Sequence, residues 1–345
     1  YDYPEEQRQG VQYLNLAETG HTGIYGAPST GKTTLLKTIL MSCAVYFTPE
    51  DIQIYGIDCG GWSTSIFSDL PHTGGIALDC EPEKVEKLQK LLWEILEARK
   101  RLFLNARVSS LSAYREASGE KIPAVILAID NLPALFELYP DTENLMITLT
   151  REGGAYGIYV IFTAGSSTGV RYKVQQNIKG AVAFDLTDKS DYTNLIGRIS
   201  GRSLPKVTGR AWIKGMPPMM FQAAVFMEGA TELDRTKNAQ ALFAQMNEAW
   251  TGPRPDPIPV MPQTVTLEEM KAAYTCRTRI PVGIEYEHIR VSYADLKTDY
   301  HLVVSGSIGC GKSRWMNLTA QMIHEKRPED KIYIFDSLKA AMSAG

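Results

Sequence analysis

The sequence of 345 residues has few cysteines, no long apolar run and no excess of charge of one sign. Its five cysteines are scattered and form no CxxC pair, which argues against a zinc knuckle or a disulfide framework and favours a reducing environment. No apolar run approaches the ~20 residues that a membrane-spanning helix requires. With 36 basic and 39 acidic residues, the net charge of −3 gives no overall attraction to nucleic acid or to an acidic membrane. These observations leave a globular protein whose length fits about two domains.

Two stretches of the chain resemble each other. Gly26 matches Gly306 and Lys32 matches Lys312, and both pairs are 280 positions apart (306 − 26 and 312 − 32). Self-similarity at this period indicates duplicated domains, because the repeats of a solenoid are much shorter.

A proline-rich run lies between the two copies and favours an extended, stiff segment. We therefore expect a first module over residues 1–250, a linker with a short helix over 251–280, and a second module that begins at 281. Only the N-terminal part of that second module, 281–345, is expected here, because the chain is expected to be a fragment.

Each copy carries the pattern GxxxxGK[ST]. The first reads Gly26, Ala27, Pro28, Ser29, Thr30, Gly31, Lys32 and Thr33, with Thr34 next. The second reads Gly306, Ser307, Ile308, Gly309, Cys310, Gly311, Lys312 and Ser313. A short strand is predicted before each loop, over 23–25 and 302–305, and a helix after each, over 34–41 and 314–323. This strand–loop–helix context is that of a phosphate-binding P-loop.

The chemistry of a P-loop explains why these residue types are needed. Glycines let backbone N–H groups surround the phosphates at a helix N-terminus. The lysine neutralises phosphate charge, and the hydroxyl of Thr33 or Ser313 is a magnesium ligand. The sequence therefore predicts two sites for ATP with Mg²⁺.

Apolar runs of strand length alternate with helical patterns after the first loop. They cover Ala124–Asp130, 158–163 and 180–185, and a helical pattern covers 83–105. Strands that are apolar on both faces indicate a parallel sheet covered by helices on both faces. With the P-loops, the predicted fold class is α/β, a P-loop NTPase in tandem modules.

An acid at the end of the 124–130 run, Asp130, is placed to hold magnesium through water. The residue after Asp130 determines whether the site has the usual general base, because many P-loop motors have glutamate there to polarise the attacking water. Here it is Asn131, and an amide does not act as a general base. Asp58, at the end of the predicted strand Ile52–Asp58, is either a substitute base or, as we favour, the cap of a turn.

Together these features resemble the FtsK/SpoIIIE-type ATPases and, more narrowly, the EssC/EccC ATPases of type VII secretion. The residues that carry the resemblance, besides the tandem loops, are the Asp130-Asn131 pair, residues 177–179 and 188–191, residues 195–198, the Gly209-Arg210 turn and residues 218–222. The resemblance covers nearly the whole chain. It implies a RecA/FtsK-like P-loop fold, and it implies that the chain is the second ATPase module plus the start of the third.

The resemblance also implies partners and a location. The parent protein would be anchored in the membrane outside this fragment, with its ATPase modules on the cytoplasmic side of the cell membrane. Its partners would be small helical secreted substrate proteins, neighbouring ATPase modules of the same chain, and further copies in a homo-oligomer, a hexamer by family.

Three functions remain open at this point. The first is an ATP-binding module of a secretion ATPase with weak or absent hydrolysis. The second is an FtsK-like translocase of double-stranded DNA, which the charge balance and the sequence Thr163-Ala164-Gly165-Ser166 disfavour, because DNA-pumping relatives usually carry a TQRP-like run there. The third is a non-enzymatic cargo-docking receptor on an ATPase fold.

Overall fold

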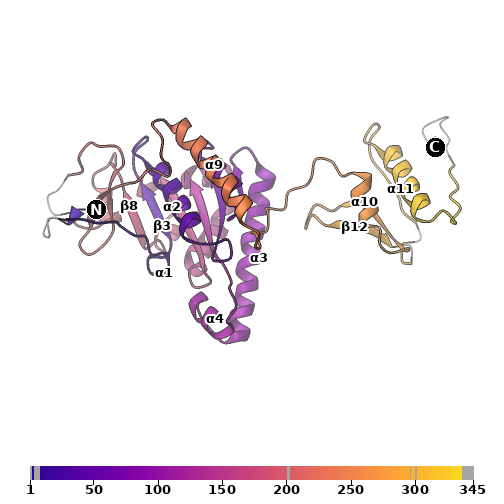
Figure 1. Ribbon diagram of the computed structural model, residues 1–345, viewed down its shortest axis with the longest axis horizontal. Helices are drawn as coiled ribbons and strands as arrows, with labels where there is room; N and C mark the ends of the chain where they lie inside the picture. Colours follow the sequence, from indigo (N-terminus) through magenta and orange to yellow (C-terminus); the bar gives the residue numbers. More distant parts are fainter. Residues whose placement is uncertain (1, 4–7, 200–202, 296, 300, 336–345) are drawn as a thin grey trace. The chain divides into compact units, whose positions relative to one another are not determined.

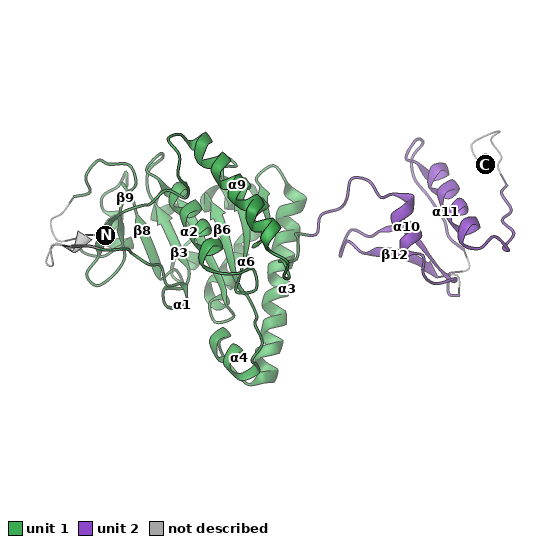
Figure 2. Ribbon diagram, in the orientation of Figure 1, with its two compact units in different colours: residues 1–258 green, residues 259–345 purple. Residues whose placement is uncertain are grey.

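The computed structural model describes residues 2–3, 8–199, 203–295, 297–299 and 301–335. The chain forms two compact units, Tyr1–Ile258 (unit 1) and Pro259–Gly345 (unit 2), which are coloured separately in Figure 2. Within the described residues, none of the helices combines the length and apolar character needed to span a membrane.

Unit 1 is built on a sheet that has eight strands in the described part of the chain, in the order β10-β9-β8-β3-β7-β6-β4-β5. The strands are β3 (Thr22–Tyr25), β4 (Ile52–Asp58), β5 (Thr73–Leu78), β6 (Ala124–Asp130), β7 (Ile158–Ala164), β8 (Gly180–Ala183), β9 (Arg210–Ile213) and β10 (Met219–Gln222). Strands β3 to β8 run parallel to one another. Strands β9 and β10 form an antiparallel hairpin on the β8 edge.

Helices cover both faces of this sheet, as Figure 1 shows for unit 1. On one face lie α2 (Lys32–Tyr46), η1 (Ser65–Asp69) and α9 (Glu232–Ala249). On the other lie α3 (Pro82–Ala106), α5 (Leu132–Leu138), α6 (Thr142–Thr148), α7 (Tyr172–Gln175) and α8 (Asp191–Leu195).

Strand β6 shows why two layers form. Its odd-numbered Val125 and Leu127 pack with the α3 layer, whereas Ile126 and Ala128 pack with the α2 layer. Because side chains alternate along a strand, an unbroken apolar run requires cover on both faces. The predicted α/β class with a parallel sheet between helices is confirmed.

Smaller elements complete unit 1. They are β1 (Asp2–Tyr3), β2 (Arg8–Gln9), α1 (Leu16–Thr19), α4 (Leu111–Ser118), the π-helix η2 (Leu149–Gly153) and the 3₁₀ helix η3 (Ser167–Gly169).

The first part of the proline-rich segment belongs to unit 1. Ile258 is 5% exposed, and its N–H donates to the carbonyl of Gly74 at 3.1 Å. The Tyr55 hydroxyl donates to the carbonyl of Asp256 at 2.9 Å. A Cβ on Gly75 would lie 2.8 Å from the Ile258 side chain, so the glycine lets this segment approach the edge strand β5. The compact unit therefore extends to Ile258, past the expected module end at residue 250.

Unit 2 contains α10 (Leu267–Ala273), the antiparallel pair β11 (Arg279–Ile284) and β12 (Val291–Asp295), and α11 (Lys312–Lys326). The side chains of Thr266 and Glu269 form a capping box at the start of α10. The predicted strand over 302–305 is wrong, since these residues form no strand and Val303 is 85% exposed. A strand requires a hydrogen-bonded neighbour, and no other strand pairs with 302–305 in the described part of the chain.

His21 precedes β3 and is buried, with 5% of its surface exposed. Its Nδ1 accepts the N–H of Val160 at 3.0 Å. Burial, and secondly the nearby Lys179, lower the pKa of His21 from 6.5 to about 4. The folded state therefore binds this proton more weakly than the unfolded chain does. The resulting stability is present above pH 6.5 and is lost as the pH falls toward 4.

This shift predicts an acid sensitivity that depends on His21. Between pH 7 and pH 5 the free energy of unfolding should fall by about 2 kcal/mol more in the wild type than in His21→Gln, which keeps an acceptor for Val160 but does not titrate. Chemical unfolding of both proteins at the two pH values measures the difference. Equal losses would show that His21 does not titrate in the unfolding reaction.

Candidate functional site

The first glycine-rich loop connects β3 to α2, as the motif requires. Ser29 and Gly31 adopt positive φ values of 61° and 113°, which turn the chain into the N-terminus of α2. The φ of Gly31 is one that residues with a side chain rarely adopt, and a Cβ there would lie 3.4 Å from the Cα of Gly209, so the loop and the segment before β9 pass close to each other. The N–H of Gly209 donates to the carbonyl of Thr30 at 3.0 Å, which ties the segment before β9 to the loop.

The ammonium group of Lys32 turns back into its own loop. Its Nζ donates to the carbonyls of Gly26 at 2.8 Å and Ala27 at 2.9 Å. Burial lowers the pKa of Lys32, while the nearby carboxylate of Asp130 opposes that shift. A half-buried cation inside a loop at a helix N-terminus is a suitable counter-charge for phosphate.

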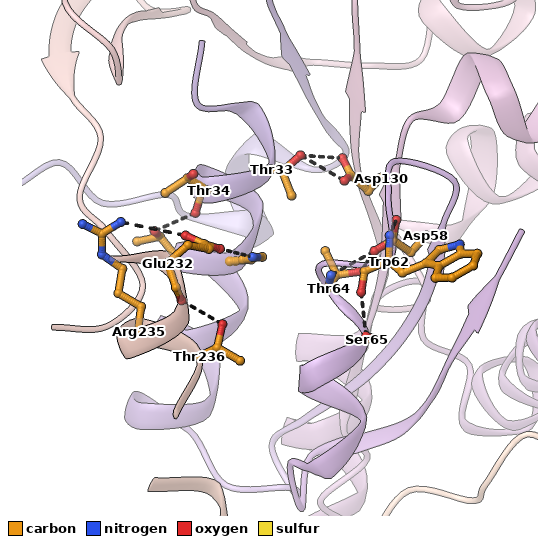
Figure 3. Close-up of polar contacts among 12 residues, drawn as sticks. Thr33, Thr34, Asp58, Trp62, Thr64, Ser65, Asp130, Glu232, Arg235 and Thr236 are labelled. Carbon is orange, nitrogen blue, oxygen red and sulfur yellow. Dashed lines mark hydrogen bonds and ion pairs between the residues drawn. The ribbon is translucent and has the colours of Figure 1, made fainter. Parts of the chain in front are cut away.

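Asp130 lies at the end of β6 and faces the start of α2 (Figure 3). The hydroxyl of Thr33 donates to its two carboxylate oxygens at 2.9 and 3.1 Å, and the hydroxyl of Thr163 donates to one of them at 2.5 Å. Burial raises the pKa of Asp130, and so does the neighbouring Asp58. Placing a divalent cation beside the carboxylate would favour its ionised form. A hydroxyl with one carboxylate fits magnesium, which is commonly held by one or two carboxylates plus waters and phosphate oxygens.

Asn131 follows in the left-handed region, with φ 68° and ψ 66°. Its main-chain N–H donates to the Thr163 hydroxyl at 2.8 Å, and its side-chain amide donates to the carbonyl of Cys59 at 3.2 Å. Asparagine tolerates this backbone conformation better than most residues. The amide thus ties the end of β6 to the loop after β4.

Asp58 is fully buried and caps the loop after β4. One carboxylate oxygen accepts the N–H groups of Gly60 and Trp62, at 2.9 and 3.1 Å. The other accepts the N–H and hydroxyl of Thr64, at 2.9 and 2.7 Å (Figure 3). Since both oxygens are engaged, the geometry favours the capping role over that of a substitute base.

Sequence reasoning missed the part played by Gly60. A Cβ at this position would lie 2.4 Å from a carboxylate oxygen of Asp130, so the loop can pass over the carboxylate only as glycine. The signal available in the sequence was the Gly60-Gly61 pair directly after a strand that ends in an acid.

Sequence reasoning also missed a group of contacts that attach α2 to α9 and to the segment before it. The ammonium of Lys37, which is 3% exposed, pairs with Glu232 of α9 at 2.7 Å and lies 5.0 Å from the ring centroid of Phe226. The hydroxyl of Thr38 donates to the carbonyl of Ala224 at 2.7 Å. Figure 3 shows Glu232 facing α2. The segment that leads into α9, and α9 itself, thereby fix the helix that begins at the P-loop.

The second loop, in unit 2, repeats the lysine contacts of the first. Nζ of Lys312 donates to the carbonyls of Gly306 at 2.8 Å and Ser307 at 2.6 Å, and Gly309 and Gly311 have positive φ. Ser313, at the matching position to Thr33, is exposed and has no acidic partner among the described residues.

Comparisons with known proteins agree with this geometry. The model of the FtsK/SpoIIIE family matches residues 2–232. The type VII secretion system protein EssC of Staphylococcus aureus (strain MRSA252) is 32% identical over 306 residues, which are 86% of this chain and 20% of that protein. The chain spans about a fifth of the length of the first two curated relatives it matches.

Two solved structures are similar over most of the chain. EssC (ATPases 2 and 3) from Geobacillus thermodenitrificans has a TM-score of 0.87 and 29% identity, covering 95% of this chain and 64% of that one. Thermomonospora curvata EccC (ATPases 2 and 3), in complex with a signal sequence peptide, has a TM-score of 0.68 and 27% identity, covering 93% and 59%. These similarities confirm the resemblance that the motifs indicated.

Proposed function

The chain belongs to the FtsK/SpoIIIE family, and on that premise we propose that unit 1 is an ATP-binding module of a type VII secretion ATPase, with weak or absent hydrolysis. The observation that carries the proposal is that Lys32, Thr33 and Asp130 lie together at one edge of the sheet. The residue beside them, where a general base is usual, is an asparagine. Binding groups are complete there, whereas the general base is missing.

Each residue has a role in this proposal. Lys32 and the main-chain N–H groups of residues 29–34 bind the phosphates of ATP, and the Thr33 hydroxyl with Asp130 holds Mg²⁺. When bound, magnesium neutralises phosphate charge. Thr163 orients the Asp130 carboxylate through its hydroxyl, and Asn131 fixes the loop that carries Gly60.

We extend the proposal to the layout and partners of the chain. Residues 1–250, with the packed segment up to Ile258, form the first module, and 281–345 form the beginning of a second, in which residues 306–313 form its phosphate loop. The partners are small helical secreted proteins and neighbouring ATPase modules, at the cytoplasmic side of the membrane. The similar EssC and EccC structures, named as ATPases 2 and 3, and the signal sequence peptide in one of them support this extension.

ATP with magnesium is expected to stabilise unit 1. A ligand that binds only the folded state adds about 2.7 kcal/mol at a hundredfold excess over its Kd. Thermal unfolding with and without ATP and magnesium measures the gain, and the same addition to Lys32→Ala is the control. An unfolding temperature that ATP leaves unchanged would contradict the proposal.

The same preparation separates the alternatives. A DNA translocase should bind duplex DNA with an affinity that falls steeply as salt rises. A non-enzymatic docking receptor should capture cargo equally well in the wild type and in Lys32→Ala. We expect neither result: DNA binding should be weak at physiological salt, and cargo capture should depend on ATP.

A further inference from the structure

A groove of about 620 Å³ opens on unit 1 away from the P-loop. Its wall comes from the residue before β8, the end of α8 with the residues that follow, and the turn between β9 and β10. The lining residues are Lys179, Thr193, Asn194, Ile196, Gly197, Arg198, Lys214, Gly215, Met216, Pro217 and Pro218.

The topology places the groove and the P-loop at opposite edges of the sheet. The P-loop follows the carboxyl end of β3, to which β8 is parallel. Lys179 immediately precedes β8 and therefore lies at the amino end of these strands. Lys214 immediately follows β9, which runs antiparallel to β8, so it lies at that same edge.

The charge of the groove is positive. Lys179, Arg198 and Lys214 line it, and no lining residue is acidic. None of these three side chains has an ion-pair partner among the described residues. The whole chain has a net charge of −3, so this group of three cations is a local concentration that opposes the overall sign. Uncompensated cations around a concave surface attract an anionic partner and raise its rate of association.

The groove also has an apolar part. Ile196, 2% exposed, forms its base, and Met216 is fully exposed on the turn beside Pro217 and Pro218. An exposed methionine is an adaptable contact, because its unbranched side chain fits irregular partners. Gly197 has φ 100°, and even a Cβ there would only reach 4.0 Å from Pro218, so this wall stays open.

We propose that this groove binds an acidic peptide segment of a partner protein, which inserts one apolar side chain between the cations. A concave slot suits a side chain, whereas an acidic bilayer would require a protruding apolar surface. Duplex DNA would require a longer basic stripe than three residues provide. The site is independent of the nucleotide site and goes beyond the proposed ATP-binding function.

Fluorescence anisotropy with the 345-residue chain tests the proposal. The probe is a short fluorescein-labelled peptide with glutamates on both sides of one leucine. We expect salt-sensitive binding that weakens about tenfold when the glutamates become glutamines, and about tenfold in Lys214→Glu or Arg198→Glu. Lys237→Glu, which reverses an exposed charge on α9, should bind like the wild type.

Several outcomes would overturn the proposal. They are absence of peptide binding, equal losses in Lys237→Glu and Lys214→Glu, or binding that ignores the glutamate-to-glutamine change. The proposal would also be overturned if vesicles containing phosphatidylglycerol, or duplex DNA, bound to the protein in place of the peptide and this binding were lost in the same variants. Lys214 and Arg198 are both exposed, so both variants should keep the fold. Loss of binding in Lys32→Ala, with the groove intact, would contradict the independence of the two sites.

Discussion

Replacing Lys32 by alanine is expected to weaken ATP binding to unit 1 by at least about 100-fold. Hydrogen bonds to a charged group contribute roughly 1.5–3 kcal/mol each, and the lysine ammonium meets more than one phosphate oxygen in a P-loop. The variant should keep its fold, because within the described part of the chain the ammonium bonds only to the carbonyls of Gly26 and Ala27 in its own loop. Equilibrium binding of a fluorescent ATP analogue measures the change.

The second loop complicates this measurement and sets the control. Lys312 makes the same contacts as Lys32, so unit 2 is a second candidate for nucleotide binding. The experiment is therefore carried out in a Lys312→Ala background, with Lys237→Ala as a matched surface change. If Lys32→Ala binds as tightly as this background protein, the phosphate site does not lie in residues 26–33.

The P-loops and the end of β6 were predictable because their signals are local. A loop with Gly26 and Gly31 at fixed spacing can form only a few backbone shapes, and the apolar run Ala124–Asp130 requires burial on both faces. By contrast, β5 was not predicted, since Gly74 and Gly75 interrupt its apolar pattern. Its role emerges only with its neighbours, β4 and the segment that ends at Ile258.

The environment of the candidate catalytic residues could not be predicted for a related reason. Whether Asp58 acts as a base or a cap depends on which groups surround it, and the donors come from a loop whose path the sequence does not specify. The contact of Gly60 with Asp130 joins residues 70 positions apart (130 − 60). The predicted strand over 302–305 failed likewise, because strand formation depends on a partner and not on the run itself.

Placing glutamate at position 131 is expected not to restore hydrolysis. A missing general base costs about 10²–10⁴ in rate, so the wild type should turn over far below the ~10 s⁻¹ of a typical enzyme. The carboxylate that Asn131→Glu introduces is not expected to act as a base. The backbone there is left-handed, and the present side chain points to the carbonyl of Cys59. Steady-state phosphate release by both proteins is the measurement.

Glutamate at position 131 also has energetic costs that oppose its use as a general base. Glutamate in the left-handed region costs roughly 1–2 kcal/mol, and the lost amide donor leaves the Cys59 carbonyl without its partner. The new charge would also lie near Asp130 and Asp58, and the proximity of Asp58 already raises the pKa of Asp130.

Asn131→Gly is the matched control, since it relieves the strain but adds no charge. We expect Asn131→Glu to unfold more easily than Asn131→Gly, with turnover in both still below about 0.1 s⁻¹. Turnover near 10 s⁻¹ in Asn131→Glu would show instead that the loop around Cys59 rearranges and that a base was all the site lacked.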